Sequence, residues 1–290
     1  MTYTLAIGDR HYSSWSLRGW LLFEKFDLPV KVKTAHLYTD AFPAMLQDFA
    51  PARMVPVMKT PKGVVVQDTL AMAETLAERH PKAQMWPKDA KARMMARSIV
   101  AEMHSGFTAL RSACAMNLRR AYVGFTPDDF VRADIARIEQ LWHMARGAFG
   151  QTGPWLLGEY SIADAFFAPV AARIVTFDLP IANASAAYVD AHLNDGAFRR
   201  WRAMGFAQNY IQQTYEFDLP ERAWPGAAPL AAKAVKSGPS ENATCPYSGL
   251  PSVDYLQIDG RTFGFCNPFC RDKTLADPLA WPDFVNIYEN

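Results

Sequence analysis

The chain has 290 residues, of which 50% are hydrophobic, and its 30 basic and 29 acidic side chains leave a formal net charge of +1. A chain of this length has room for two or three domains. Nucleic-acid-binding proteins usually have a strongly basic face or domain, and the near-zero net charge gives no sign of one, which argues against a DNA or RNA function. It has no signal peptide pattern and no apolar run long enough to cross a membrane, so we expect a cytoplasmic protein without membrane partners.

The first 80 residues alternate between strand and helix patterns. Residues 2–8 predict a strand, the spacing over 17–24 predicts a helix, and residues 30–34 alternate as a second strand. Two short apolar runs then flank a turn at residues 60–63, and a helix follows from Asp68. The order β-α-β followed by β-β-α predicts a thioredoxin-like α/β domain over residues 1–82.

From Trp86 onward the hydrophobic period becomes helical. Helical patterns over 89–118, 126–149, 161–177, 185–193 and 196–212 predict an all-helical domain over residues 88–215. Cys114 stands alone within one of these patterns and is expected in the core. Residues 216–242 are rich in proline and alanine, which indicates a linker or a segment wrapped on the surface. Residues 243–290 are expected to form a separate small unit.

Three serines lie at the start of the first predicted helix, in the stretch Ser13-Ser14-Trp15-Ser16. A hydroxyl at a helix N-terminus can donate a hydrogen bond to an anion such as a thiolate, whose pKa then falls. It can equally cap the helix, and the local sequence leaves both interpretations open.

Two further motifs admit both a ligand-binding and a structural interpretation. Val55-Pro56 precedes a strand: a cis proline would present the Val55 backbone to a peptide-like ligand, whereas a trans proline would simply start the strand. Asp68-Thr69 opens a helix, where the two side chains can cap the helix or bind an amino-acid head group.

In this order, and followed by a helical domain, these motifs resemble the glutathione S-transferase family, most of all its serine-type zeta, theta and tau classes. A fourth match is Ser161-Ile162-Ala163-Asp164, which looks like the family's N-capping box. The resemblance covers residues 1–215. It implies the glutathione transferase fold, a homodimer, and glutathione as co-substrate.

The resemblance also implies roles for single residues. Ser13, with Ser14 and Ser16 as alternatives, would hold the glutathione thiolate. The implied glutathione contacts are Arg53, Val55, Pro56, Asp68 and Thr69, with Arg53 a substitute for the basic or polar residue that many relatives have where this chain has Met54. The implied pocket for the second substrate is lined by Met103, His104, Phe107 and Arg111, in which His104 either polarises the substrate or packs in the core.

Three of the four cysteines lie in the last 46 residues, as Cys245, Cys266 and Cys270. Thiolates at this spacing can converge on one zinc ion, and the pattern resembles the YHS/TRASH family of small treble-clef metal-binding modules. Ser248 stands where such modules often have another cysteine. A weak or open zinc site, a metal-free module, and a disulfide between Cys266 and Cys270 are therefore the alternatives.

Two functions follow as hypotheses. The first is a glutathione transferase-like enzyme that activates the glutathione thiolate for conjugation to, or isomerisation of, a hydrophobic electrophile. The alternative is a non-catalytic scaffold of the same fold whose cysteine module binds a metal or a partner protein. Reduction of disulfides or dehydroascorbate is disfavoured because the loop carries Trp15 and serines where that chemistry needs a cysteine.

Overall fold

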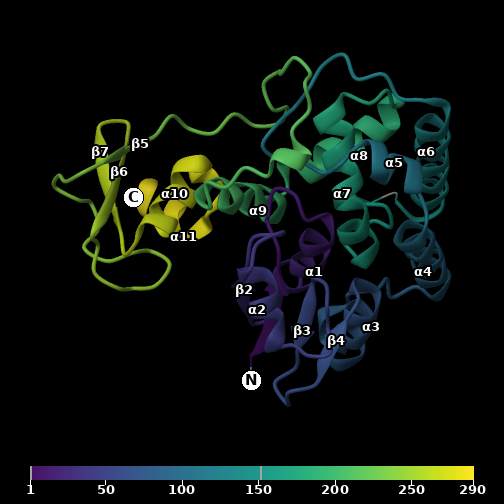
Figure 1. Cartoon of the computed structure of the whole chain (residues 1–290), viewed down its shortest axis with the longest axis horizontal. Coiled ribbons are helices and arrows are strands. Elements are labelled where there is room, and N and C mark those ends of the chain that lie inside the picture. Colours follow the sequence, from purple (N-terminus) through teal and green to yellow (C-terminus); the bar gives the residue numbers. More distant parts are fainter. Residues whose placement is uncertain (1, 151) are drawn as a thin grey trace. The chain divides into compact units, whose positions relative to one another are not determined.

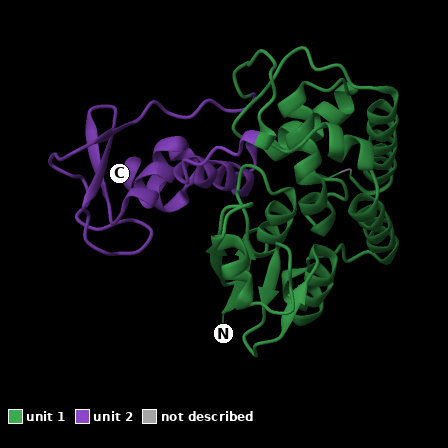
Figure 2. Cartoon of the chain, viewed as in Figure 1, with its two compact units in different colours: residues 1–193, 214–224 green, residues 194–213, 225–290 purple. Residues whose placement is uncertain are grey.

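The computed structural model describes residues 2–150 and 152–290, and its contacts divide the chain into two compact units (Figures 1 and 2). The first unit comprises residues 1–193 and 214–224, and the second comprises residues 194–213 and 225–290. Within the described ranges, none of the helices combines the length and the apolar character that crossing a bilayer requires.

The first unit begins with a four-stranded sheet of order β2-β1-β3-β4 (Figure 1). Its strands are β1 (Tyr3–Ile7), β2 (Val30–Thr34), β3 (Val57–Lys59) and β4 (Val65–Gln67). β1 runs parallel to β2 and antiparallel to β3, and its central residue Leu5 pairs with Val32 on one side and Met58 on the other. This mixed sheet is the arrangement that the β-α-β and β-β-α patterns predict.

Helices cover both faces of this sheet. α1 (Ser14–Glu24) and α3 (Thr69–Arg79) pack against each other, α1 against β1 and α3 against β3 and β4. α2 (Ala41–Gln47) contributes to a hydrophobic cluster that includes Ala6 and Val57, which lie on the other face. The sequence pattern did not predict α2, since Asp40 makes no side-chain cap bond and the helix is only 7 residues long.

Five helices form the rest of the first unit: α4 (Ala90–Ser105), α5 (Thr108–Ala113), α6 (Asp129–Phe149), α7 (Ile162–Phe177) and α8 (Asn183–Asn194). α7 is buried along its whole length and packs against α1 and α4, as a helix that is apolar on all sides does. Cys114 ends α5 as a buried residue, and burial raises the pKa of its thiol to about 12. Its predicted core position is thus confirmed.

The predicted capping box starts α7. Ser161 accepts a hydrogen bond from the backbone N–H of Ala163, and the Asp164 carboxylate accepts one from the backbone N–H of Ser161 at 2.9 Å. Tyr188 of α8 also donates to Asp164, at 2.9 Å. The box therefore fixes the start of the central helix and joins it to α8.

Asp164 should make the stability of the protein depend on pH. Burial raises the pKa of its carboxyl from 3.8 to about 6, so between these values the folded chain binds more protons than the unfolded chain. The free energy of unfolding, measured relative to Asp164→Asn, should fall by about 3 kcal/mol as the pH rises from about 4 to 7. Urea denaturation of both proteins across this range measures the difference, and a constant difference would contradict the assignment.

The second unit combines a three-stranded antiparallel sheet with helices. Its elements are α9 (Gly196–Ala207), β5 (Lys233–Val235), β6 (Asp254–Ile258), β7 (Arg261–Phe265), α10 (Pro268–Ala276) and α11 (Pro282–Tyr288). Short 3-10 turns at Pro81–Ala83, Gln213–Tyr215 and Pro278–Ala280 complete the assignment of both units.

Two features of the second unit differ from the sequence pattern. α9, placed by its period in the helical domain 88–215, packs on α10, and Arg199 of α9 forms a two-pronged ion pair with Asp277 at 2.7 and 2.9 Å. β5 lies within the segment 216–242 that was expected as a linker, and it pairs with β6. Long-range pairing of this kind leaves no local signal in a proline-rich segment.

Candidate active site

The N-terminus of α1 is held by serine hydroxyls. Ser13 is the N-cap, and its Oγ accepts a hydrogen bond from the Ser16 backbone N–H at 3.2 Å and donates to the Ser16 Oγ at 2.7 Å. The Ser16 Oγ also accepts from the Gly8 backbone N–H at 3.0 Å. Ser16 is fully buried within these bonds, so its role here is to tie the loop after β1 to α1.

Ser14 differs from its neighbours because its Oγ accepts a hydrogen bond from a guanidinium. The Nη2 of Arg173, on α7, donates to it at 3.2 Å. Since an accepted bond uses a lone pair and not the proton, the Ser14 hydroxyl keeps its O–H for another acceptor. A cation beside a hydroxyl also strengthens it as a donor.

Two cavities lie beside these serines and share Trp15, Met54 and Val55 as walls. The first, of about 550 Å³, is lined by Trp15, Pro51, Arg53, Met54, Val55, Pro56, Gln67, Asp68 and Thr69. The second, of about 540 Å³, is lined by residues that include Ser13, Ser14, Tyr38, Arg111, Arg173 and Tyr215. The site thus has one compartment bordered by the starts of β3 and α3 and another bordered by the start of α1.

The first cavity contains all five residues that the sequence singled out for glutathione. The Val55–Pro56 bond is cis, as the first of the two interpretations expected. The pairing of β3 with its neighbours starts at Val57, so Val55 lies outside the sheet register, on the cavity wall. Arg53 and Met54 also line this cavity, and Met54 is 73% exposed.

Asp68 and Thr69 open α3 at the edge of the first cavity. The Asp68 Oδ1 accepts from the backbone N–H groups of Leu70 and Ala71, so the residue is an N-cap, and φ at Asp68 is +76°. Thr69 is 0% exposed, and its Oγ1 has no hydrogen-bond partner in the described parts of the chain. A buried hydroxyl without a partner, at a helix N-terminus that lines a cavity, suits an anionic ligand group.

His104, near the end of α4, contacts residues at the starts of α1 and α3. Its Nε2 lies 3.1 Å from the Asp68 Oδ2, and its ring packs edge-on against Trp15. Burial, as the largest effect, lowers the pKa of His104, while the Asp68 carboxylate raises it. His104 lines neither cavity and instead orients the side chain of Asp68.

The four residues proposed for the second-substrate pocket are not all at the cavity. Arg111 lines the second cavity, whereas Met103 and Phe107 do not. Met103, on α4, is 0% exposed and lies in the hydrophobic core. Phe107 is also buried, and it is the N-cap of α5, with φ of +60°. The helix ends at Ser105, so the expected helical spacing does not carry past Gly106.

Trp15 and Arg173 are site residues that motif reasoning missed. Trp15 is a wall of both cavities, and the guanidinium carbons of Arg18 and Arg111 lie 4.7 and 5.1 Å from its ring centroid. Arg173 offered a sequence signal, because it is the one cationic residue within the apolar helix α7. A charged residue is rarely fully buried unless it is paired, so an isolated arginine in such a helix indicates a specific contact.

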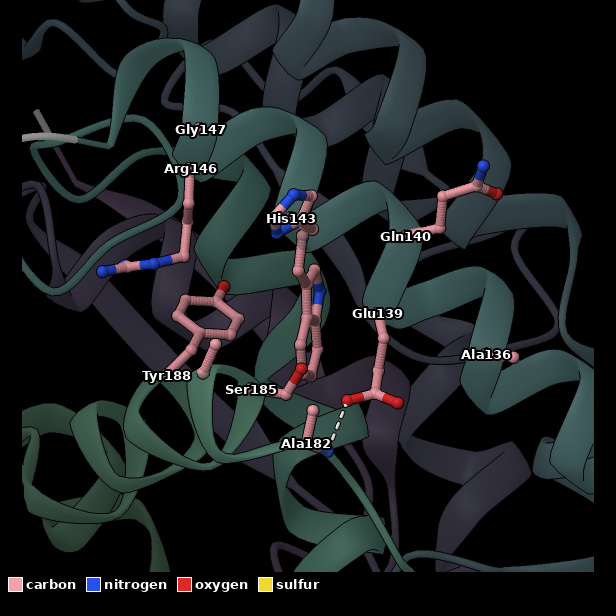
Figure 3. A pocket seen from close by; sticks show the side chains of 11 residues that line it. Ala136, Glu139, Gln140, His143, Arg146, Gly147, Ala182, Ser185 and Tyr188 are labelled. Atoms are coloured by element: carbon pink, nitrogen blue, oxygen red, sulfur yellow. Dashed lines mark hydrogen bonds between the residues drawn. The ribbon is translucent and has the colours of Figure 1, made fainter.

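A third cavity, of about 420 Å³, lies between α6 and α8 and shares no lining residue with the other two (Figure 3). Glu139 points to the start of α8, where it accepts from the Ala182 backbone N–H at 2.8 Å (Figure 3). No residue proposed from the sequence lines this cavity.

The cysteine cluster belongs to the second unit. The Sγ atoms of Cys245, Cys266 and Cys270 lie within 4.8 Å of one another, and those of Cys266 and Cys270 are 3.9 Å apart. Ser248 donates to the Cys266 Sγ at 3.2 Å. Although burial raises the pKa of Cys245, hydrogen bonds from the Cys266 and Tyr247 backbone and from Ser248 lower it to about 7.

Comparison with known proteins agrees with the geometry of the first unit. Residues 12–79 match the family model described as the N-terminal domain of glutathione S-transferase. A probable maleylacetoacetate isomerase from Caenorhabditis elegans is 31% identical over 109 residues, which are 38% of this chain and 50% of that protein. The chain therefore spans half the length of this curated relative.

Solved structures show the fold. A glutathione transferase homologue from Burkholderia, crystallised with bound glutathione, superimposes with a TM-score of 0.52 at 20% identity, over 71% of this chain and 98% of that one. A glutathione transferase from Methylococcus capsulatus gives 0.53 at 17% identity, over 70% and 98%. Glutathione transferase Omega 3C from Trametes versicolor gives 0.53 at 18% identity, over 69% and 87%. The chain thus has the glutathione transferase fold.

Proposed function

We propose that the chain is a glutathione transferase that forms the glutathione thiolate at the start of α1. One observation carries this proposal. The hydroxyls of Ser13 and Ser14 lie on the wall of the second cavity, and this cavity shares Val55 and Trp15 with the first cavity, beside β3 and α3, where the peptide would bind. The family match over residues 12–79 supports it.

Glutathione would lie in the first cavity. The backbone of Val55 would pair with the cysteinyl residue, because it is outside the sheet register. The start of α3, with Thr69 and Asp68, would hold the γ-glutamyl group, and Arg53 would face the glycyl carboxylate. The thiol would then reach the second cavity past the shared wall of Trp15 and Val55.

The reaction begins when the thiol loses its proton to water. The helix N-terminus and the hydroxyl of Ser14, whose proton is not donated to another residue that the structure describes, would stabilise the sulfur anion, which lowers the thiol pKa. The Ser13 hydroxyl would do so only after giving up its bond to the Ser16 Oγ. The thiolate attacks an electrophilic carbon in the second cavity, and a leaving group departs with its electron pair. In an isomerisation, the sulfur would add to a double bond, the resulting single bond would rotate, and the thiolate would leave again.

The test of this proposal is thioether formation. The chain, glutathione and an aromatic halide are incubated, and the product is measured by mass spectrometry against a reaction without the chain. Faster product formation supports the proposal, and equal rates count against it. We also propose a homodimer, on the family resemblance, which light scattering of the purified chain tests.

A second role, zinc binding by the cysteine cluster, is favoured by one observation. A tetrahedral zinc site with Zn–S bonds of about 2.3 Å places its sulfur atoms about 3.8 Å apart, and the Cys266 and Cys270 Sγ atoms are 3.9 Å apart. Cys245 would supply the third thiolate. This role would make the transferase fold a support for a metal-binding module, as the alternative hypothesis holds.

Zinc binding predicts a stoichiometry. The chain should retain about one zinc ion after dialysis, because three thiolates hold the ion together. Cys266→Ser and Cys270→Ser should lose it, whereas Cys114→Ser, which changes a buried core thiol, should keep it. Elemental analysis of each protein measures the content. A wild-type chain that holds no zinc and whose half-buried thiols Cys266 and Cys270 react freely would count against the site.

A further inference from the structure

The second cavity is positively charged. It is lined by 2 arginines, Arg111 and Arg173, and none of its lining residues is acidic. Asp9, on the loop after β1, is bonded elsewhere: its carboxylate accepts from the Leu37 backbone N–H at 2.9 Å and lies 2.5 Å from the His36 Nδ1. The Asp134 carboxylate, which accepts from the Leu110 backbone N–H at 2.9 Å, acts on Arg111, but no lining residue carries a negative charge toward Arg173. An apolar electrophile, as the family resemblance implies, would leave the charge of Arg173 uncompensated.

Arg173 is bound entirely by neutral acceptors. Its guanidinium donates to the backbone carbonyls of Cys114 and Pro169 and to the Ser14 Oγ, at 2.9, 3.1 and 3.2 Å. Arg173 is 5% exposed, and no carboxylate of the described residues forms an ion pair with it. Such a buried cation is costly unless an anion joins it.

Arg111 adds a second cation to the same wall. Its Nη2 donates to the backbone carbonyls of Met103 and His104, and its Nε has no hydrogen-bond partner in the described chain. Its guanidinium carbon lies 5.1 Å from the centroid of the Trp15 ring, a contact that favours its position on the cavity wall. Arg18 lies over the same ring, and its Nε and Nη1 likewise have no partner in the described chain.

The charge of Arg111 acts on the other two cations, while the carboxylates of Asp68 and Asp134 act in the opposite direction on Arg18 and Arg111. After burial, which is the largest effect, the charge of Arg111 lowers the pKa of both Arg18 and Arg173. Neighbouring like charges in a buried place repel, and a bound anion relieves that repulsion. Buried arginines arranged in this way are a common means of binding carboxylates, because the guanidinium fork matches the two oxygens.

We propose that Arg111 and Arg173 form an anion subsite in the second cavity, so that the second substrate carries a carboxylate near its electrophilic carbon. This inference rests on the proposed transferase function and narrows its substrate class from hydrophobic to anionic electrophiles. The carboxylates of glutathione do not fill this subsite, because they are assigned to the first cavity, at Thr69 and Arg53.

The test compares two electrophiles that differ by one charge, 4-chloro-3,5-dinitrobenzoate and its methyl ester. With either, the glutathione sulfur forms a bond to the ring carbon that bears chlorine, chloride leaves with the bonding electrons, and the thiol proton passes to water. Each kcat/KM is divided by the rate constant for free glutathione at the same pH, which removes the intrinsic difference in reactivity. If the arginines only stabilised the thiolate, both normalised values would be equal.

We expect the normalised kcat/KM to be about 10- to 100-fold higher for the acid than for the ester. In Arg111→Gln the ratio should fall toward one without reaching it, because Arg173 still carries its charge. In Arg111→Lys, which keeps the charge without the fork, the ratio should lie between those of Arg111→Gln and the wild type. Arg132→Gln, a change in an exposed arginine that pairs with Asp129 on α6, should keep the wild-type ratio. A wild-type ratio near one would overturn the subsite.

A second measurement does not depend on any variant being folded. Benzoate should inhibit the wild-type reaction with the ester competitively, and neutral benzamide should not; equal inhibition by both would overturn the subsite. Calorimetric titration of glutathione is run in parallel. A chain that binds glutathione but shows no preference for acids contradicts the subsite alone, whereas a chain that binds no glutathione contradicts the proposed function and the subsite with it.

Discussion

Ser14→Ala should lower kcat/KM for glutathione conjugation about 100- to 1000-fold, the usual cost of removing one hydrogen-bond donor from a developing or bound anion. Arg173 donates to the Ser14 Oγ at 3.2 Å, so the hydroxyl proton is left for the sulfur. Without it the thiol pKa should rise toward the value of about 8.5 that a free thiol has. Steady-state kinetics with a neutral aromatic halide measure the loss.

Ser13→Ala tests the cap of α1 more than the stabilisation of the thiolate. The Ser13 Oγ accepts from the Ser16 backbone N–H and donates its proton to the Ser16 Oγ, so the variant should lose about 1 kcal/mol of stability and less activity than Ser14→Ala. Ser105→Ala, which changes an exposed hydroxyl that donates to the Ala101 carbonyl on α4, is the control and should match the wild type. Full activity in both Ser13→Ala and Ser14→Ala would contradict thiolate stabilisation by a serine hydroxyl.

Asp164→Ala should lower the free energy of unfolding by about 3 to 5 kcal/mol at pH 7. The carboxylate accepts four hydrogen bonds: from the backbone N–H groups of Leu156 and Ser161 at 3.1 and 2.9 Å, from the Ser161 hydroxyl at 3.2 Å and from the Tyr188 hydroxyl at 2.9 Å. An alanine leaves these buried donors without an acceptor. Urea denaturation followed by circular dichroism measures the change.

Two variants show whether the loss comes from the whole network. Ser161→Ala removes one cap bond and should cost about 1 kcal/mol. Tyr188→Phe removes one buried donor together with its hydrogen bond to Asp164, and should cost a similar amount. A loss below about 1 kcal/mol in Asp164→Ala would show that the capping box does not stabilise α7.

Local signals predicted the parts of the site that lie at helix starts. The caps at Ser13, Asp68 and Ser161 are all present, because a cap depends on residues within one turn of the helix. The order of strands and helices along the first 80 residues, apart from α2, was predicted for a similar reason, because each hydrophobic period is local. The pairing of β1 with β3 joins distant segments and has no such local signal.

Contacts between distant segments could not be predicted in this way. The bond from Arg173 to Ser14 spans 159 positions, and the pair of His104 with Asp68 joins α4 to α3. The expected pocket residue Met103 instead packs in the core, because the rotation of α4 about its axis is set by tertiary packing. A residue of α4 can contact a ligand only if it lies on the side of the helix that faces the cavity.

The most direct test of the account is a calorimetric titration of glutathione into the wild-type chain and into the Ser13→Ala/Ser14→Ala double variant, with the thiolate followed by ultraviolet difference absorbance. The wild type should bind glutathione with a thiol pKa below the free value of about 8.5, and the double variant should lose this thiolate signal. No binding by the wild type at millimolar glutathione would contradict the proposed function.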